Sequence, residues 1–370
     1  MKNVIIVGGG IAGLITAICL ARKNISTTVI EKGDYPAHRV CGEYVSNEVL
    51  PFLQSLGLYP FNFEVPRIDR FQLSATNGRT AQLPLDLGGF GISRYSFDQH
   101  LYEHAKQVGV QFLLDTTVNT LTFSQNTFLV KAGTREIEAD IVIGAHGKRS
   151  VLDRQMQRSF IKKRSPFMAA KYHLQTDLPD NLIALHNFQG GYCGISKVEN
   201  NVTNLCYLAH RDTVRNAGDL PSFERDVLCK NPLLKHIFDN SHFLFDKPLT
   251  IGEVSFATKG PVEDHVLMAG DAAGMIAPLC GNGMSMAVHS AKLVSETIIR
   301  YATAKSFSRA VLESHYTEQW RKNFANRLWL GRQMQRLFGN HAASSVAVNL
   351  ALYIKPLARQ LVRNSHGQPF

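Results

Sequence analysis

Residues 2–14 read KNVIIVGGGIAGL, and this stretch with its surroundings decides the fold. Lys2–Val7 is a short β-branched, apolar run, which predicts a buried parallel strand. Residues 14–22 then have a helical composition, and residues 27–30 predict a second strand. Between the first strand and the helix stand the glycines of a G-x-G-x-x-G pattern: Gly8, Gly10 and Gly13. In this context the pattern predicts a Rossmann unit that binds a dinucleotide.

Each glycine of the turn has a physical role in that prediction. Gly8 permits the tight turn, Gly10 lets a pyrophosphate approach the backbone, and Gly13 lets the helix pack close to the sheet. The first N–H groups of the helix face the phosphates, and Glu31 at the end of the second strand accepts hydrogen bonds from a ribose. The residues that we assign to this half of the cofactor site are Gly8, Gly10, Ile11, Ala12, Gly13, Glu31 and Lys32.

A second nucleotide-contacting segment lies far along the chain. Residues 265–274 read HVLMAGDAAG, an apolar strand that runs into a turn of small residues containing Asp271. A glycine turn at 281–283 follows, and residues 284–299 have a helical composition. An NAD dehydrogenase does not need such a distant segment, so the pair of motifs favours FAD over NAD.

At this point the sequence resembles the superfamily of FAD-dependent aromatic hydroxylases and geranylgeranyl reductases. Its members carry a GD motif of this shape and then a P-x-x-G-x-G turn, here residues 278–283. The resemblance implies that Asp271 binds the flavin ribityl chain. It also implies that a helix N-terminus faces the flavin N1–C2=O edge, where reduced flavin is anionic. The residues implied are Gly270, Asp271, Pro278, Gly281, Asn282, Gly283 and Met284.

Two more segments fit the same superfamily. Residues 94–101 match R-x-x-F-D-x-x-L, which implies that Arg94 lies near the flavin and that a helix opens here with Ser96 as its cap. Residues 138–147 are similar to the strand and turn of the family's DG motif, with His146 in place of the aspartate. That departure weakens the inherited case for NADH or NADPH binding, although either remains the expected reductant.

Arg39-Val-Cys41-Gly-Glu43 is similar to the C-G-E turn of geranylgeranyl reductase-like proteins. The resemblance implies that Arg39 contacts the adenosine or pyrophosphate and that Cys41 and Glu43 line the flavin or substrate side. The alternatives are a small buried cysteine in a tight turn and a glutamate that caps a surface helix.

The middle of the chain, residues 156–258, predicts an antiparallel substrate domain, because residues 168–174, 182–188 and 204–210 alternate with period two. Residues 191–197 read GYCGISK where the reductases show Y-x-W-x-F-P-K, so Tyr192 and Lys197 are candidate substrate contacts. Core packing and a solvated strand end are the alternatives. The W-x-W-x-I-P pattern of halogenases is absent from the sequence, which argues against halogenation. The three histidines on the predicted strands are expected to be structural: His173, His186 and His210.

The net charge of +10 is unevenly distributed. Residues 319–370 contain eight Lys or Arg and no acidic residue. Phe324, Leu328, Met334 and Phe338 in this tail fall at near-helical spacing. The tail therefore predicts either docked helices with a solvated basic face or an amphipathic surface that contacts an anionic membrane or an acidic carrier protein. The sequence contains no motif that would support nucleic-acid binding. No stretch is apolar enough to span a bilayer, no signal peptide or metal-ligand spacing is recognisable, and the six cysteines are scattered. We therefore expect a cytoplasmic protein, with association with a membrane surface as the alternative.

These observations predict an α/β fold with a Rossmann-type FAD-binding domain (1–155 with 259–300), a substrate domain with a central antiparallel sheet (156–258) and a helical basic tail (301–370). The expected function is an FAD-dependent, NADH- or NADPH-dependent monooxygenase that hydroxylates a small aromatic or lipophilic substrate. One alternative is reduction of C=C bonds in a lipophilic chain, which the C-G-E turn and the Tyr-Lys remnant favour. A second is a flavin-binding redox module without catalysis.

Overall fold

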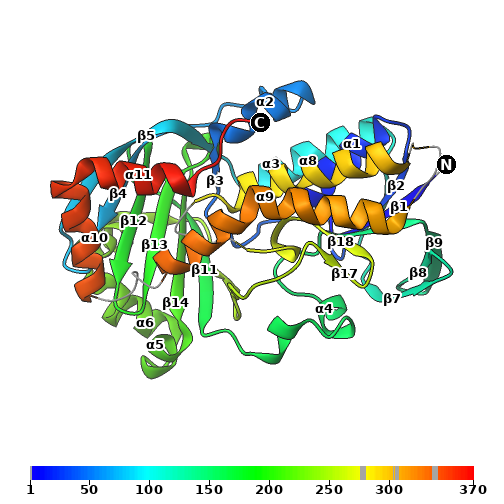
Figure 1. Ribbon diagram of the computed structural model, residues 1–370. Helices are drawn as coiled ribbons and strands as arrows, with labels where there is room; N and C mark the ends of the chain where they lie inside the picture. The colour runs from blue at the N-terminus through cyan, green and yellow to red at the C-terminus, as the bar shows by residue number, and fades with distance from the viewer. Residues whose placement is uncertain (1, 276–280, 303, 305–307, 336–340) are drawn as a thin grey trace.

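The computed structural model of the protein describes residues 2–275, 281–302, 304, 308–335 and 341–370. Two sheets dominate it, and a bundle of helices lies along one side of the smaller sheet (Figure 1). The smaller sheet is parallel apart from one edge pair, as expected for a doubly wound nucleotide-binding unit. In spatial order its strands are β17 (Val262–Glu263), β18 (Val266–Met268), β10 (Ile141–Gly144), β1 (Asn3–Val7), β2 (Ser26–Ile30) and β6 (Gln111–Leu113).

The predicted motifs stand at the ends of these strands. β1 pairs in parallel with both β2 and β10, which places the glycine turn and the DG-like turn at the same edge of the sheet. β18, which precedes the GD motif, pairs with β10 at that edge. The helices on this side are α1 (Ile11–Ala21), α3 (Arg94–Gln107), α8 (Gly283–Ala302) and α9 (Arg309–Gln335), and Figure 1 shows α8 and α9 running along each other.

The larger sheet has nine strands and is mostly antiparallel. In spatial order they are β15 (His242–Phe243), β11 (Phe167–Gln175), β14 (Thr203–His210), β13 (Gly191–Lys197), β12 (Leu182–Phe188), β4 (Arg67–Ser74), β5 (Thr80–Gly91) and β3 (Tyr44–Ser46), with β16 (Leu249–Ile251) paired to β11. Residues 44–91, which the sequence assigned to the FAD-binding domain, therefore supply three strands of this sheet. The link is the parallel pairing of β4 with β12, from Arg70 opposite Leu182 to Ser74 opposite His186.

Each face of the larger sheet carries its own apolar core. The inner face joins the main core, which extends through the parallel sheet and its helices. The outer face packs against three short helices and forms a separate core that contains Phe188, Tyr207 and Phe223. The remaining elements are α2 (Leu50–Ser55), α4 (Val151–Gln155), α5 (Arg211–Asn216), α6 (Leu220–Asp226), α7 (Pro232–Asn240), a small sheet of β7 (Val118–Ser124), β8 (Thr127–Ala132) and β9 (Arg135–Ala139), and the C-terminal helices α10 (His341–Tyr353) and α11 (Lys355–Ser365).

The long tail helix α9 is docked on the protein. Its buried residues recur every four positions, from Leu312 through Tyr316, Trp320 and Phe324 to Leu328, and form one stripe against α8. Phe324 and Leu328, which the sequence offered as part of an amphipathic membrane-facing surface, are 0% and 5% exposed and belong to the core. Among the basic residues interleaved with this stripe, Arg327 is 10% exposed, and its Nη2 donates to Oε1 of the buried Glu48 at 3.0 Å. Phe338, the last residue of the proposed stripe, lies outside the described residues.

Candidate active site

A cavity lies between the parallel sheet and the inner face of the larger sheet, and we call it the central cavity. It contains about 1430 Å³ of space outside protein atoms, part of it open to solvent. Its walls include residues from the glycine turn, the C-G-E turn, the start of α3, the GD turn, the start of α8 and the inner face of the larger sheet. One lining residue from each is Gly10, Cys41, Arg94, Asp271, Gly283 and Tyr192.

The glycines of the cavity leave room that side chains would fill. A Cβ on Gly10 would meet only the Nη2 atom of Arg94, at 3.4 Å, and one on Gly283 would meet nothing within 4 Å. A Cβ on Gly13, in contrast, would lie 2.0 Å from the carbonyl oxygen of Gly8, so this glycine serves helix packing. The first turns of α1 and α8 thus border the cavity without side chains in front of them. This arrangement fits a pyrophosphate at α1 and the flavin edge at α8.

The adenosine side is organised by Glu31, which is 7% exposed. Its Oε2 accepts a hydrogen bond from the backbone N–H of Gly9 at 2.7 Å, and its Oε1 lies 3.2 Å from Nη2 of Arg39. Arg39 therefore reaches this site through Glu31. Lys32 is exposed and, like Glu31 and Arg39, is not among the described residues that line the central cavity, so its contact with the cofactor stays a prediction.

Arg94 stands at the wall of the cavity beside Gly10 and is held by a bidentate ion pair. Its Nε and Nη2 donate to the two carboxylate oxygens of Asp98, at 2.8 and 2.5 Å. The prediction that Ser96 caps this helix was wrong. The helix begins at Arg94, and the capping residue is Ser93, whose Oγ accepts from the backbone N–H of Ser96 at 3.0 Å.

The GD turn is packed directly on the first turn of α1. Gly270 has φ of +60°, and a Cβ there would lie 3.1 Å from the Cβ of Ala12. Its backbone N–H donates to Oγ of Ser290 on α8 at 3.0 Å. This contact puts Asp271 in the cavity wall between the starts of two helices, a position that fits the ribityl chain of a bound flavin. The turn residues Gly281, Gly283 and Met284 also line the cavity, Asn282 is buried beside them, and Pro278 lies outside the described residues.

The C-G-E turn is anchored by a buried cluster of charges. Glu43 is 0% exposed, so it does not cap a surface helix. Its Oε1 accepts from Nζ of Lys171 at 2.5 Å and from the backbone N–H of Arg94 at 2.7 Å, and its Oε2 lies 2.7 Å from Nε2 of His173. The Nδ2 of Asn204 donates to the carbonyl oxygen of Cys41 at 3.2 Å. Strands β11 and β14 of the larger sheet thus hold this turn against the cavity.

Electrostatics keep Glu43 ionised in this environment. Burial alone would raise the pKa of Glu43, but the hydrogen bonds and charges of His173 and Lys171 hold it below its usual 4.5. Glu43 also has φ of +53°, a left-handed conformation that its three partners stabilise. The sequence did not identify Lys171 and His173 as a pair. The available signal was their spacing, because ionisable residues two apart on a strand point to the same face.

The two substrate candidates on β13 have different surroundings. Tyr192 is 3% exposed, lines the central cavity, and its Oη donates to Oε1 of Gln335 at 3.3 Å. Lys197 binds Asp180 and Asn201 at the rim of the sheet, with Nζ–O distances of 2.7 and 2.6 Å. Lys197 is not among the described residues that line the central cavity, because residues five apart on a strand point to opposite faces.

His146, which replaces the aspartate of the DG motif, belongs to a buried chain of polar contacts. Its Nε2 lies 3.2 Å from Oδ1 of Asp153, which also accepts from Nη1 of Arg158 at 2.8 Å. Burial would raise the pKa of Asp153, but these two partners lower it to about 2. Arg158 also donates to the carbonyl oxygen of Ala272 at 2.9 Å. The chain thus ties the DG-like turn to the GD turn.

The other two strand histidines have structural surroundings. Nδ1 of His186 lies 2.9 Å from Oγ of Ser74, and burial lowers the pKa of His186 to about 4. His210 is the N-cap of α5. Among the described residues, no cluster of three or more His, Cys, Asp or Glu side chains is arranged to hold a metal ion.

Lys259 joins the same two turns from the other side. Its Nζ donates to the carbonyl oxygens of Lys148 and Asp271, at 2.8 and 2.9 Å. The carbonyl of Asp271 is thereby fixed although its carboxylate remains at the cavity wall. Burial lowers the pKa of Lys259 from 10.5 to about 8.

Substitution of Lys259 by methionine should change the pH dependence of stability. Between pH 8 and 10.5 the unfolded chain holds this proton and the folded chain does not, so the free energy of unfolding of the native protein rises with pH in this window. The Lys259→Met variant should lack that rise, whereas Lys247→Met, at an exposed lysine, should keep it. Urea titrations at several pH values measure both. Parallel curves for the native protein and Lys259→Met would contradict the assignment.

Comparison with known proteins places this geometry in a family. The model of a family described as "FAD binding domain" matches residues 1–319. The chain belongs to this family of aromatic hydroxylase and geranylgeranyl reductase-like flavoproteins. It is an FAD-dependent oxidoreductase. The cavity described above brings together residues of the motifs that predicted an FAD site.

Similar proteins include reductases and a halogenase. Digeranylgeranylglycerophospholipid reductase 1 of Methanopyrus kandleri is 23% identical over 90% of this chain and 90% of its own. A geranylgeranyl bacteriochlorophyll reductase-like structure from Thermoplasma acidophilum aligns with TM-score 0.80 at 17% identity, covering 98% of this chain and 95% of that one. A flavin-dependent brominase aligns with TM-score 0.77 at 18% identity, covering 98% and 93%. The structural matches show a shared fold.

Proposed function

We propose that this flavoprotein is a monooxygenase that takes electrons from NADH or NADPH and hydroxylates a lipophilic substrate with an aromatic head. The observation that carries the proposal is the wall of the central cavity on the larger sheet. Most of the described residues that line this wall are apolar or aromatic, and they include Phe71, Ala169, Ile183, Leu185, Tyr192, Gly194 and Leu208.

An apolar wall opposite the flavin suits oxygen chemistry. FAD held at the starts of α1 and α8, once reduced by NADH or NADPH, would supply the two electrons needed to split O2, so that one oxygen atom would enter the substrate and the other would take up two protons and leave as water. Exclusion of water by the wall favours oxygen transfer over the release of peroxide. The hydroxyl of Tyr192 on this wall is suited to orient a phenolic substrate. Its Oη donates its own proton to Gln335, so it can accept a hydrogen bond from the hydroxyl of the substrate. Glu43 and Arg94 contribute to the cavity wall and hold the C-G-E turn and the start of α3 in place.

Reduction of a C=C bond in a lipophilic chain is the second candidate. It is favoured by Cys41, whose thiol lies at the cavity where a proton donor would be needed after hydride transfer. The relative named for a digeranylgeranylglycerophospholipid substrate supports a lipophilic molecule in either reaction. In this case hydride adds to one carbon and a proton to the other.

Reoxidation of the reduced holoprotein tests the proposal without knowledge of the substrate. The purified protein is photo-reduced anaerobically and mixed with oxygenated buffer in a stopped-flow spectrometer. We expect a transient absorbance that differs from both oxidised and reduced flavin. A single-step return to the oxidised spectrum, unchanged by added long-chain alkylphenols, would contradict the monooxygenase proposal and direct the search to alkenes.

Filling the cavity at Gly194 should separate substrate turnover from cofactor binding. A Cβ on Gly194 would have its nearest contact with the carbonyl oxygen of Cys206 at 3.8 Å, so the backbone accepts a side chain. We expect Gly194→Leu to retain FAD and to lose about 100-fold in kcat/KM, because displaced substrate misses the flavin. Gly194→Ala is the matched control with a small effect. Oxygen uptake driven by NADPH with an alkylphenol measures both, and undiminished uptake by the leucine variant would contradict a substrate wall on β13.

A further inference from the structure

The corner between α10 and α11 carries a cluster of exposed apolar side chains. Among the described residues nine large hydrophobic side chains are exposed, and four of them lie within twelve positions of this corner. They are Val346 (66% exposed), Tyr353 (74%), Ile354 (51%) and Leu357 (48%). Single exposed hydrophobic residues need no explanation, but a cluster marks an interaction surface. We call these four residues the corner patch.

The fold does not need the corner patch for its own packing. The other side of the same two helices supplies the core contacts, through Val348, Ala351 and Ala358, which are 0–5% exposed. α10 and α11 both pack against β5 with that side. Figure 1 shows the two helices as an outer layer over β4 and β5, at the end of the molecule opposite the N-terminus. The two helices are therefore packed on the protein by their buried side, and the corner patch lies on the exposed side.

Basic residues surround the corner patch. Lys355, Arg359 and Arg363 are exposed on α11, and Arg79 from the β4–β5 turn donates to Oη of Tyr353 at 2.9 Å. No acidic residue follows Glu318 in the sequence. An apolar patch with a basic rim is complementary to an anionic bilayer, whose headgroups attract the charges while the apolar residues enter the boundary with the acyl chains.

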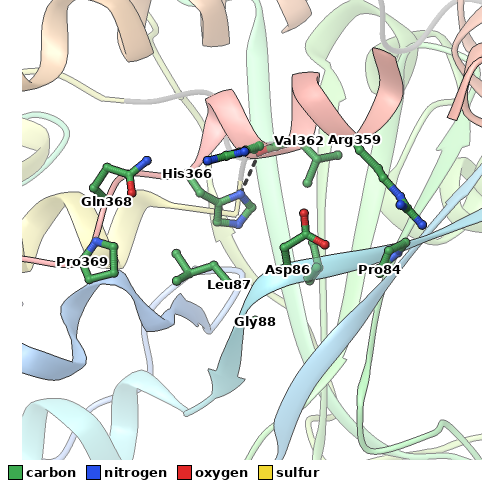
Figure 2. Close-up of a pocket in the computed structure, with 12 residues that line it drawn as sticks. Pro84, Asp86, Leu87, Gly88, Arg359, Val362, His366, Gln368 and Pro369 are labelled. Carbon is green, nitrogen blue, oxygen red and sulfur yellow. Dashed lines mark hydrogen bonds between the residues drawn. The ribbon is translucent and has the colours of Figure 1, made fainter. Parts of the chain in front are cut away.

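A pocket beneath α11 is less suited to bind a lipid phosphate than the exposed surface around the corner patch. Figure 2 shows Arg359, Val362 and His366 reaching from α11 towards β5, with Asp86 on the strand side of the same pocket. The carboxylate of Asp86 would repel a phosphate group inside this pocket. We therefore assign the headgroup contacts to Lys355 and Arg79, which are exposed and do not line this pocket.

We propose that the corner patch and its basic rim dock this protein on an anionic phospholipid bilayer as a peripheral protein. Among the described helices none is long and apolar enough to cross a membrane, so docking would be confined to one leaflet surface. The inference is independent of the reaction at the flavin. It has one consequence that rests on the proposed function. Gln335, the last residue of α9, binds Tyr192 of the cavity wall, and Figure 1 shows this end of α9 directed towards α10, so a lipophilic substrate would meet the membrane-facing end of the protein near its site.

Vesicle co-sedimentation of the FAD-loaded protein tests the proposal. We expect binding to vesicles of phosphatidylcholine with one third phosphatidylglycerol, weak binding to phosphatidylcholine alone, and loss of binding at high salt. The variant Tyr353→Ser/Ile354→Ser/Leu357→Ser should bind at least about tenfold more weakly. Its matched control, Val151→Ser/Leu244→Ser/Val311→Ser, removes three exposed apolar residues from elsewhere and should bind like the native protein.

A charge variant keeps the test decisive if the apolar variant is unstable. Lys355→Gln/Arg79→Gln alters two exposed side chains and should weaken binding about fivefold for each charge. Flavin content and melting temperature verify that every variant is folded. The proposal is overturned if the native protein stays in the supernatant with anionic vesicles, if it binds both vesicle types equally, or if the control triple loses as much binding as the corner triple. Changes in binding with unchanged NADPH oxidation in detergent solution distinguish this surface from the active site.

Discussion

Replacement of Gly10 by valine is expected to abolish FAD retention and yield a colourless, folded apoprotein. The backbone of Gly10 has φ −82° and ψ −175°, which valine adopts readily, and its Cβ would meet only the flexible end of Arg94. The added side chain would occupy the space through which a pyrophosphate approaches the first turn of α1. We expect FAD to bind at least about 100-fold more weakly, a loss of about 2.7 kcal/mol. Flavin absorbance after gel filtration and titration of the apoprotein measure the loss.

The control for this substitution is Gly252→Val. Gly252 is exposed, has nothing within 4 Å of its Cβ position and does not line the central cavity. It should keep full flavin content. A yellow Gly10→Val protein with the native FAD affinity would refute the placement of the pyrophosphate at α1.

Substitution of Glu43 by glutamine is expected to cost about 3 kcal/mol of stability, because it leaves the Lys171 ammonium buried without its counter-charge. The variant Glu43→Gln/Lys171→Met removes both charges and should recover much of this loss. Chemical denaturation of all three proteins measures it. The control is Glu224→Gln, since the buried carboxylate of Glu224 accepts hydrogen bonds from Tyr172 and Tyr207, which an amide oxygen also accepts.

Acidification should remove the contribution of Glu43 to the free energy of unfolding. The pKa of Glu43 is below its usual value in the folded protein, so its contribution is complete above about pH 4.5 and is lost as the pH falls through the folded pKa. The native protein and Glu43→Gln should therefore converge in stability on acidification. Burial raises the pKa of Glu224, so its variant should show the opposite trend. A constant difference between native protein and Glu43→Gln down to pH 3 would contradict an ionised Glu43.

The FAD half of the site could be predicted because its signals are local. The turn at Gly10 needs specific glycines at fixed spacing, and the turn at Asp271 joins a strand to a small-residue loop, so each can be recognised without knowledge of its partners. The structure brings both to the same edge of the parallel sheet. Residues 44–91 could not be assigned in the same way, because their membership depends on pairing between β4 and β12, more than a hundred residues apart.

The substrate side was harder for a similar reason. Cys41 and Tyr192 do line the cavity, but the assignment of Lys197 followed a family pattern and neglected the alternation of side chains along the strand. The partners of Glu43 come from a strand 128 residues away, and a buried charge cluster of this kind leaves only a weak trace in sequence. That trace is a pair of ionisable residues at alternate positions of a strand that is otherwise apolar.

The most direct test of the central claim compares FAD with FMN as ligands of the apoprotein. We expect the flavin to bind at α8 and Asp271, and the pyrophosphate and adenosine to bind at α1 and Glu31. The AMP half of FAD should therefore contribute a large part of the affinity. Titration followed by flavin fluorescence should give a Kd for FAD at least about 100-fold lower than for FMN. Equal affinities for FAD and FMN would contradict the dinucleotide cradle and with it the placement of the substrate cavity.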